Sequence, residues 1–218
     1  MQTPQHATLD FVADIICPWC AIGHRHLNAA LSTLATEGLV ITVMWRPFLL
    51  YPNAPPEGFA QQEHLLQRFG SREAADRYHA GVTEAARAVG FDIDYERISV
   101  TPSTLNAHRV LLLAEASGRQ FQLADALART FFEEGGDIAD PAALCRMTGA
   151  VGVNPAAVAE MLASDRFLAD VQQSDLVSKQ RGIRQVPAFC MHGRILNVPD
   201  IGGLATALRA AHRSLRPQ

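Results

Sequence analysis

The sequence lacks several features that mark whole classes of protein. Its 218 residues include no run of eighteen apolar residues, so no membrane-spanning helix is expected. It has no basic excess either, because 19 Lys and Arg stand against 22 Asp and Glu, for a formal net charge of −3. Since nucleic-acid-binding domains usually carry a basic patch, no nucleic-acid partner is expected. Internal repeats and low-complexity tracts are also missing.

The first residues, M-Q-T-P-Q-H-A, lack the basic segment followed by an apolar one that marks a signal peptide. We therefore expect a cytoplasmic protein in a reducing compartment. Only four cysteines are present. In such a compartment, cysteines are more often catalytic, metal-binding or buried than paired in structural disulfides.

The first fifty residues show a β-α-β pattern. The stretch T-L-D-F-V-A-D-I-I (8–16) places apolar residues alternately on one face, which predicts a buried strand. A helix is predicted over 18–34, where Pro18 suits the first helical position because its missing N–H needs no partner there. L-V-I-T-V-M-W (39–45) is rich in β-branched residues and predicts a second strand.

Helical patterns dominate from residue 59 to 181. Asp140 and Asn154 each precede a proline, which is a typical helix start, and Ser103 could cap another helix. After Gly182 two strands are predicted, V-P-A-F-C-M and R-I-L-N-V, around a two-residue turn at His192-Gly193. A last helix is expected over 200–212.

This order predicts an α/β protein with a thioredoxin-like fold that is interrupted by a large all-helical insertion. We assign residues 1–52 and 183–218 to the thioredoxin-like domain and 53–182 to the helical insertion domain.

The motif C-P-W-C places Cys17 and Cys20 at the junction of the first strand and helix. The partial positive charge of a helix N-terminus favours an anion, so Cys17 is expected to be the reactive thiolate. Cys20, one turn further on, is more shielded and should keep the higher pKa. Two residues between the cysteines let both sulfurs meet on one helical turn. The pair is therefore expected to be redox-active, with Cys17 as nucleophile and Cys20 as resolving thiol.

Other uses of a cysteine pair fit less well. A structural zinc site needs a second pair of ligands, and Cys145 and Cys190 stand alone. Haem attachment needs a histidine directly after the second cysteine, where Ala21 stands. No metal and no tightly bound cofactor is expected. Cys145 and Cys190 are expected to be buried, inert thiols.

Val186-Pro187 opens the first strand after the insertion. A trans proline at a strand start is the ordinary interpretation, since only about 5–6% of X–Pro bonds are cis. The functional alternative is a cis proline facing the C-P-W-C motif, which would leave the backbone of Val186 free to pair with a bound peptide or with glutathione. Trp19 is expected to be exposed beside the sulfurs.

The stretch D-I-I-C-P-W-C-A-I-G-H-R-H-L resembles the signature of the FrnE-like branch of DsbA-type dithiol-disulfide oxidoreductases. Further matching segments follow in order: W-R-P-F, P-P-E-G, A-H-R-V-L-L-L-A, F-F-E-E-G-G-D-I-A-D and V-P-A-F with its hairpin. The resemblance implies a thioredoxin fold with a helical insertion and a cis bond before Pro187. It also implies the same roles for Cys17 and Cys20. The residues expected to bind the substrate are Pro18, Trp19, Val186 and Pro187.

The chain departs from this pattern near the motif. Ala21 stands where the family usually has Tyr, His24 where it usually has Lys, and Gln185 where Thr or Gly is common. Two residues are further candidates for modulating the cysteines. His24 could act as a cation or proton shuttle, although a helix-surface position is the simpler expectation. Asp14 could act as a base toward Cys20 if it is buried, although an Asp at a strand end is more often a cap.

The function that these residues favour is thiol–disulfide exchange on client proteins or on small disulfides such as glutathione. One alternative is a glutathione-dependent isomerase or transferase of the 2-hydroxychromene-2-carboxylate isomerase or kappa type, although such enzymes usually carry serine where Cys17 stands. Another is a redox-inactive chaperone module that binds clients in a cleft of the insertion. A homodimer is a possible assembly.

Overall fold

The computed structural model describes residues 5–198 and 200–214. A central mixed sheet has the strand order β2-β1-β5-β6. β1 pairs in parallel with β2 and antiparallel with β5, and β5 and β6 form a hairpin. The bounds of these strands are β1 Gln5–Ala13, β2 Leu39–Pro47, β5 Ala188–Met191 and β6 Arg194–Ile195.

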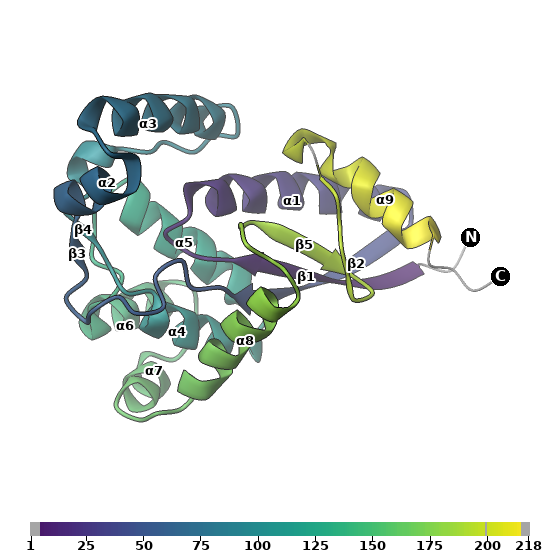
Figure 1. The fold of residues 1–218 in the computed structure, drawn as a ribbon. Coiled ribbons are helices and arrows are strands. Elements are labelled where there is room, and N and C mark those ends of the chain that lie inside the picture. The colour runs from purple at the N-terminus through teal and green to yellow at the C-terminus, as the bar shows by residue number, and fades with distance from the viewer. Residues whose placement is uncertain (1–4, 199, 215–218) are drawn as a thin grey trace.

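Helices cover both faces of this sheet (Figure 1). Helix α1 (Pro18–Thr36) links β1 to β2 and lies beside α9 (Leu204–Ser214) on one side, while α8 (Leu168–Gln180) packs near β2 on the other. The strand β1 requires cover on both sides because Phe11 and its neighbour Val12 are both buried, in separate apolar clusters. Because apolar side chains are buried on both faces of β1, this strand lies in the centre of the sheet and between its two helical layers.

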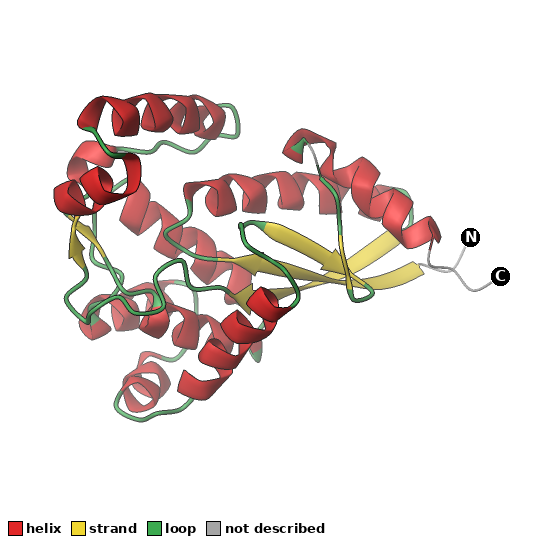
Figure 2. Cartoon of the chain, viewed as in Figure 1, coloured by secondary structure: helices red, strands yellow, loops and turns green. Residues whose placement is uncertain are grey.

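The segment between β2 and β5 is mainly helical (Figure 2). It also contains a two-stranded ladder of β3 and β4, which the sequence pattern did not predict because each strand has only two residues. A single-turn helix η1 (Tyr95–Arg97) precedes β4. The other bounds are β3 Phe59–Ala60, α2 Gln61–Phe69, α3 Arg72–Arg87, β4 Val100–Thr101, α4 Leu105–Glu115, α5 Gln120–Phe132, α6 Pro141–Ala150 and α7 Pro155–Leu162.

Two of the predicted helix starts are confirmed. Asp140 accepts hydrogen bonds from the first backbone N–H groups of α6, and Asn154 does the same for α7. The cap predicted at Ser103 is wrong, because α4 begins at Leu105 after Thr104 and has no side-chain cap.

The predicted hairpin turn at His192-Gly193 is confirmed, since both residues have positive φ, of 50° and 76°. The strand after it is shorter than expected. β6 ends at Ile195, and the final helix is preceded by a single turn, η2 (Ile201–Gly203). The division of the chain at residues 52 and 182 stays a prediction.

Candidate active site

Cys17 is the N-cap residue of α1 and has an extended backbone conformation. Its N–H donates to the carbonyl of Asp14, and its own carbonyl accepts from the N–H of Cys20 at 2.9 Å. Pro18 follows at the first helical position, as predicted. These bonds turn the chain sharply from β1 into α1 and bring both cysteines onto the first helical turn.

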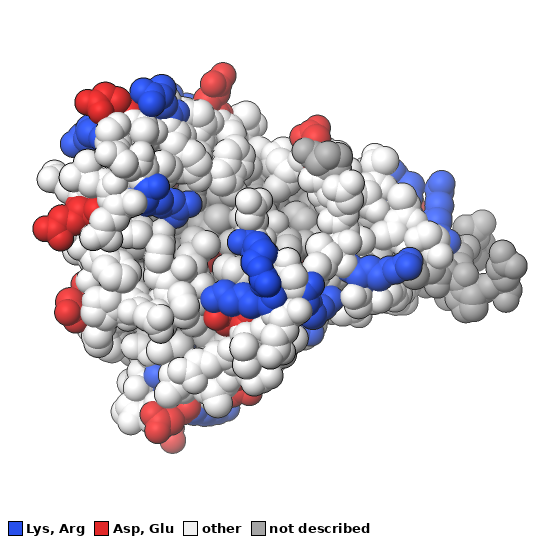
Figure 3. Space-filling view, in the orientation of Figure 1, with Lys and Arg blue, Asp and Glu red and all other residues white. Residues whose placement is uncertain are grey.

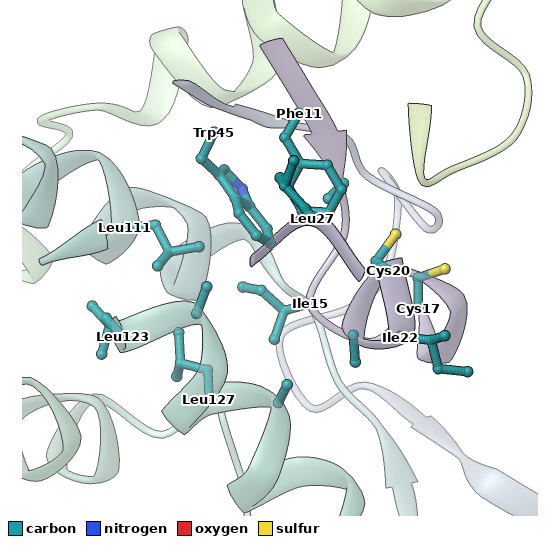
Figure 4. Packing of buried hydrophobic residues seen from close by; sticks show 14 of the residues in the cluster. Phe11, Ile15, Cys17, Cys20, Ile22, Leu27, Trp45, Leu111, Leu123 and Leu127 are labelled. Atoms are coloured by element: carbon teal, nitrogen blue, oxygen red, sulfur yellow. The ribbon is translucent and has the colours of Figure 1, made fainter. Parts of the chain in front are cut away.

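Both cysteines are free thiols that project from the start of α1 (Figure 4). Cys17 is 5% exposed and Cys20 2% exposed. The Cys17 thiol donates to the carbonyl oxygen of Val186 at 3.4 Å. Cys17 therefore lies against the segment that leads into β5, 169 residues away along the chain.

The environment of Cys20 favours its protonated form. Burial is the main reason that the pKa of Cys20 is raised well above its usual range, and its interactions with Cys17 add to the rise. The higher pKa expected for Cys20 from its position in the helix is thus confirmed in direction. Cys20 can act as a nucleophile only after another group has taken its proton.

Asp14 lies beside Cys20 and is completely buried. Its negative charge is one of the influences that raise the pKa of Cys20. One carboxylate oxygen accepts from the N–H of Leu50 at 2.8 Å, and the other lies 3.3 Å from Nε2 of His108. The structure thus places Asp14 in the interior next to the thiol of Cys20, rather than at an exposed strand end.

His108 connects Asp14 to Trp45 in the interior. The indole N–H of Trp45 points to Nδ1 of His108 at 3.3 Å. Because an indole N–H can only donate, Nδ1 must accept, which leaves the ring proton on Nε2 facing Asp14. This chain of donors fixes a neutral tautomer of His108 that donates to the carboxylate. Sequence reasoning did not find this role, although His108 stands in the A-H-R segment, because 94 residues separate it from Asp14.

The surface position expected for His24 is wrong. His24 is 4% exposed and packs against Phe121 of α5, with ring centroids 5.3 Å apart, and against Phe11 of β1. Burial lowers the pKa of His24 from 6.5 to about 4, outweighing the opposite influence of Asp125. The ring is neutral at neutral pH and therefore provides no cation for Cys17.

A pocket of about 390 Å³ opens beside Cys17. Cys17, Pro18 and Trp19 line one side of it, and Val186 lines another. Trp19 is half-buried rather than exposed as expected. Tyr51, which follows β2, lines the pocket as well. The segment between residues 53 and 182 supplies much of the remaining wall, including His64, Leu65, Arg68, Phe69, Tyr78, His79, Tyr95, Phe131 and Phe132.

The peptide bond between Val186 and Pro187 is cis. The ring of Pro187 lies against Gly23 on α1, where an added Cβ would be only 2.9 Å from the proline Cγ. The segment before β5 thus touches α1 at two places, through Val186 at Cys17 and through Pro187 at Gly23. Of the predicted substrate-binding residues, the pocket lining includes Pro18, Trp19 and Val186.

Neither a metal centre nor a membrane helix is evident in the part of the chain that the structure describes. Within residues 5–198 and 200–214, no three His, Cys, Asp or Glu side chains are grouped so that they could hold a metal ion. No helix in the same ranges is long and apolar enough to span a bilayer.

The model of the DSBA-like thioredoxin domain family matches residues 8–209. The chain belongs to this family.

Several solved structures share the fold. A probable DsbA oxidoreductase, SCO1869 of Streptomyces coelicolor, is 23% identical and superposes with a TM-score of 0.86 over 98% of this chain and 92% of that one. The cytosolic disulfide reductase DsbM of Pseudomonas aeruginosa, solved with GSH, is 19% identical, with a TM-score of 0.65 over 95% and 98% of the two chains. A 2-hydroxychromene-2-carboxylate isomerase is 12% identical, also with a TM-score of 0.65, over 96% of both chains.

Proposed function

We propose that this DSBA-like protein is a thiol–disulfide oxidoreductase or isomerase in which Cys17 is the nucleophile and Cys20 the resolving thiol. The observation that carries the proposal is the placement of the two free thiols on the first turn of α1. Cys17 lines a pocket, while Cys20 is enclosed behind it. An incoming disulfide therefore reaches Cys17 first.

The chemistry proceeds in two displacements. The Cys17 thiolate attacks one sulfur of a substrate disulfide, which forms a mixed disulfide and releases the other substrate sulfur as a thiolate. The Cys20 thiolate then attacks Cys17 Sγ, forms the Cys17–Cys20 disulfide and releases the second substrate thiolate. Two electrons pass from the protein dithiol to the substrate. The same steps in reverse oxidise a client. In isomerisation, a second thiolate of the client, instead of Cys20, attacks the mixed disulfide, which forms a new client disulfide and releases the Cys17 thiolate.

Asp14 is proposed as the group that accepts the proton of Cys20. The raised pKa of Cys20 makes such a base necessary, and the Asp14 carboxylate is the buried acidic group whose charge acts on Cys20. His108 and the N–H of Leu50 hold the carboxylate in place through hydrogen bonds. General bases work best when their orientation is fixed in this way.

The backbone of Val186 is proposed to bind the substrate. Its carbonyl accepts from the Cys17 thiol in the reduced protein. That donor disappears once Cys17 forms a disulfide, because the sulfur no longer carries a proton. The carbonyl then becomes free to accept from a backbone N–H of a bound peptide or of glutathione. Pro187, Trp19 and Pro18 would flank this contact.

The proposal can be tested by mixing the reduced protein with bis(2-hydroxyethyl) disulfide, a small neutral substrate, and analysing acid-quenched samples by mass spectrometry. The wild type should end as the Cys17–Cys20 disulfide. Cys20→Ser should stop at the mixed disulfide on Cys17, and Cys17→Ser should form neither product. Cys190→Ser, which removes another buried thiol, should behave like the wild type. Oxidation of Cys17→Ser at the wild-type rate would overturn the proposal.

The same experiment tests the role of Asp14. Asp14→Asn keeps the size of the side chain but removes the carboxylate base. The mixed disulfide should therefore form at the wild-type rate and resolve on the order of a hundredfold more slowly, the lower range for loss of general base catalysis. If the mixed disulfide is resolved at the same rate in the wild type and in Asp14→Asn, Asp14 is excluded as the proton acceptor.

A glutathione-dependent isomerase is the second candidate function, since the pocket has the size of a small-molecule site and a 2-hydroxychromene-2-carboxylate isomerase has this fold. Isomerisation in the presence of glutathione that survives Cys20→Ser would support it. Membership of the FrnE-like branch, glutathione as co-substrate and a cytoplasmic location are part of the main proposal. They are consistent with the motif pattern and with the likeness to DsbM, which is described as cytosolic.

A further inference from the structure

The charged side chains that line the pocket beside Cys17 are all positive. Its lining, within the part of the chain that the structure describes, includes Arg68 and Arg184 but no Asp or Glu. Burial lowers the pKa of His64 and of His79, so both rings are neutral at neutral pH. The net charge that faces a ligand is therefore positive.

Figure 3 shows the same bias on the surface around this region. Lys and Arg side chains gather near the middle of the view, toward the end of α8 and the segment before β5, while most Asp and Glu lie toward the edge. An overall negative chain thus presents positive charge around its reactive thiol. Such a field raises the local concentration of anions and disfavours cations.

Arg68 has the position and the free capacity to bind an anion. Its guanidinium donates to the hydroxyl of Tyr51 at 2.7 Å, and that hydroxyl also bonds Nε2 of His64 at 2.7 Å. None of the described Asp or Glu residues forms an ion pair with Arg68. A guanidinium has five N–H donors, so most of those on Arg68 remain available to a ligand.

Tyr95 provides a second, independent indication. Its hydroxyl is buried and has no hydrogen-bond partner. Burial is the main cause that raises the pKa of Tyr95, and the charges of Tyr78 and Cys17 contribute to the rise. Tyr95 and Cys17 line the same pocket. The ring is held by stacking on His79, with centroids 3.6 Å apart. A buried donor without an acceptor is costly unless a ligand supplies one.

The size of the pocket restricts what can bind. About 390 Å³ is near the lower end of small-molecule sites, and Cys17 is only 5% exposed at its wall. Trp19, Phe69 and Tyr78 add apolar surface that suits a short carbon chain. A compact molecule can reach the sulfur more readily than the surface of a folded protein.

We propose that the substrate of this site is a small disulfide that carries carboxylate groups, with one carboxylate bound by Arg68 and an acceptor atom bound by the hydroxyl of Tyr95. The inference rests on the proposed function and specifies its substrate class. Cys17 Sγ bonds to one sulfur of the disulfide, and the other sulfur leaves as a carboxylate-bearing thiolate. Cys20 then releases the second half as described above.

Three disulfides of similar length and different charge provide the test: dianionic 3,3′-dithiodipropionate, neutral bis(2-hydroxyethyl) disulfide and dicationic cystamine. The rate of mixed-disulfide formation on the reduced protein is divided by the rate with N-acetylcysteinamide, which corrects for the intrinsic reactivity of each disulfide. The corrected rate should be on the order of tenfold higher for dithiodipropionate than for cystamine.

Arg68→Glu should reverse this preference, and Arg68→Lys should largely keep it. Arg72→Glu, the same charge change on a nearby exposed residue outside the pocket lining, should leave it unchanged. Tyr95→Phe should lower the rate of mixed-disulfide formation with dithiodipropionate and leave the rate with cystamine unchanged.

The outcomes separate the inference from the proposed function. Equal corrected rates for the three disulfides, or a preference that Arg68→Glu does not change, would overturn the inference while the exchange chemistry stands. A disulfide-linked extended peptide that reacts faster than dithiodipropionate, and equally fast in Arg68→Glu, would overturn it as well. If none of the disulfides reacts with Cys17, the proposed function itself fails.

Discussion

At the scale of single residues, the interior contains ionisable side chains that are buried and hydrogen-bonded. Asp14, His24 and His108 are all at most 4% exposed, yet each has a hydrogen-bond partner. For Asp14 and His108 the partners form one chain that ends beside Cys20. His24 has a different environment of aromatic rings and one amide, that of Asn28 at 3.3 Å. Burial without partners would cost about 1–3 kcal/mol for each polar group.

His24 should make the fold sensitive to acid. Its pKa is lowered to about 4 by burial, from 6.5 in the unfolded chain, so its contribution to stability is full above pH 6.5 and is lost as pH falls through 4. The full shift corresponds to about 3 kcal/mol. His24→Gln should therefore flatten the pH dependence of the free energy of unfolding, measured with urea, between pH 6.5 and 4. His26→Gln on the same helix is the control, and an unchanged slope in His24→Gln would contradict the assignment.

At the scale of elements, the contact between α1 and the segment before β5 holds the thiol of Cys17 against the carbonyl of Val186. Gly23 allows the ring of Pro187 to lie directly on α1, and Ile201 of η2 lies near the same point, 3.2 Å from where a Cβ would stand. Close approach of this kind requires glycine. A larger residue would separate Val186 from Cys17 by moving the segment away from the helix.

Two glycine-to-alanine variants should therefore have opposite effects. Gly23→Ala forces the Pro187 ring to move, so it should destabilise the protein by about 1–3 kcal/mol, as overpacking usually does. Its Cys17 should also react more slowly with the neutral disulfide. Gly81→Ala in α3 adds a methyl group that meets nothing within 4 Å beyond its chain neighbours and its own helix backbone, so it should stabilise the protein by about 0.5–1 kcal/mol. If urea unfolding shows both variants to be stabilised equally, the contact between α1 and Pro187 leaves room for a methyl group at position 23, and the prediction is wrong.

At the scale of the whole molecule, the sheet and the insertion share a core. One apolar cluster includes Leu9 and Phe11 of β1 together with Leu111 of α4 and Leu127 of α5. Figure 4 shows Phe11, Leu111 and Leu127 in this cluster. The two segments of the predicted thioredoxin-like domain are thus not packed independently of the helices between them. A continuous core favours cooperative unfolding.

Hydrogen exchange can test this cooperativity. The slowest amides of β1 and those of α5 should exchange with the same free energy, equal to that of global unfolding, because neither element can open without exposing the shared core. Amides of α2, which has no buried residue, should exchange with a smaller free energy and serve as the internal comparison. A lower value for α5 than for β1 would show that the insertion unfolds separately.

The sequence predicted the features that depend on neighbouring residues. The first strand and helix, the His192-Gly193 turn and the starts of α6 and α7 follow from local periodicity, from φ preferences and from capping. The link from Asp14 to His108 and the burial of His24 under Phe121 could not be predicted, because each joins segments that are distant in sequence. The pocket charge likewise arises only when α2 is folded near Cys17.

The two tryptophans differ in their surroundings, which gives the protein an internal optical probe. Trp19 lines the pocket next to Cys17, whereas Trp45 is 4% exposed and enclosed by Phe11, Phe121 and His108. A molecule that enters the pocket, or a disulfide that forms there, changes the environment of Trp19 directly, whereas Trp45 is linked to the cysteines indirectly, through His108 and Asp14. Intrinsic fluorescence therefore reports occupancy and redox state of the site mainly through Trp19, without any attached dye.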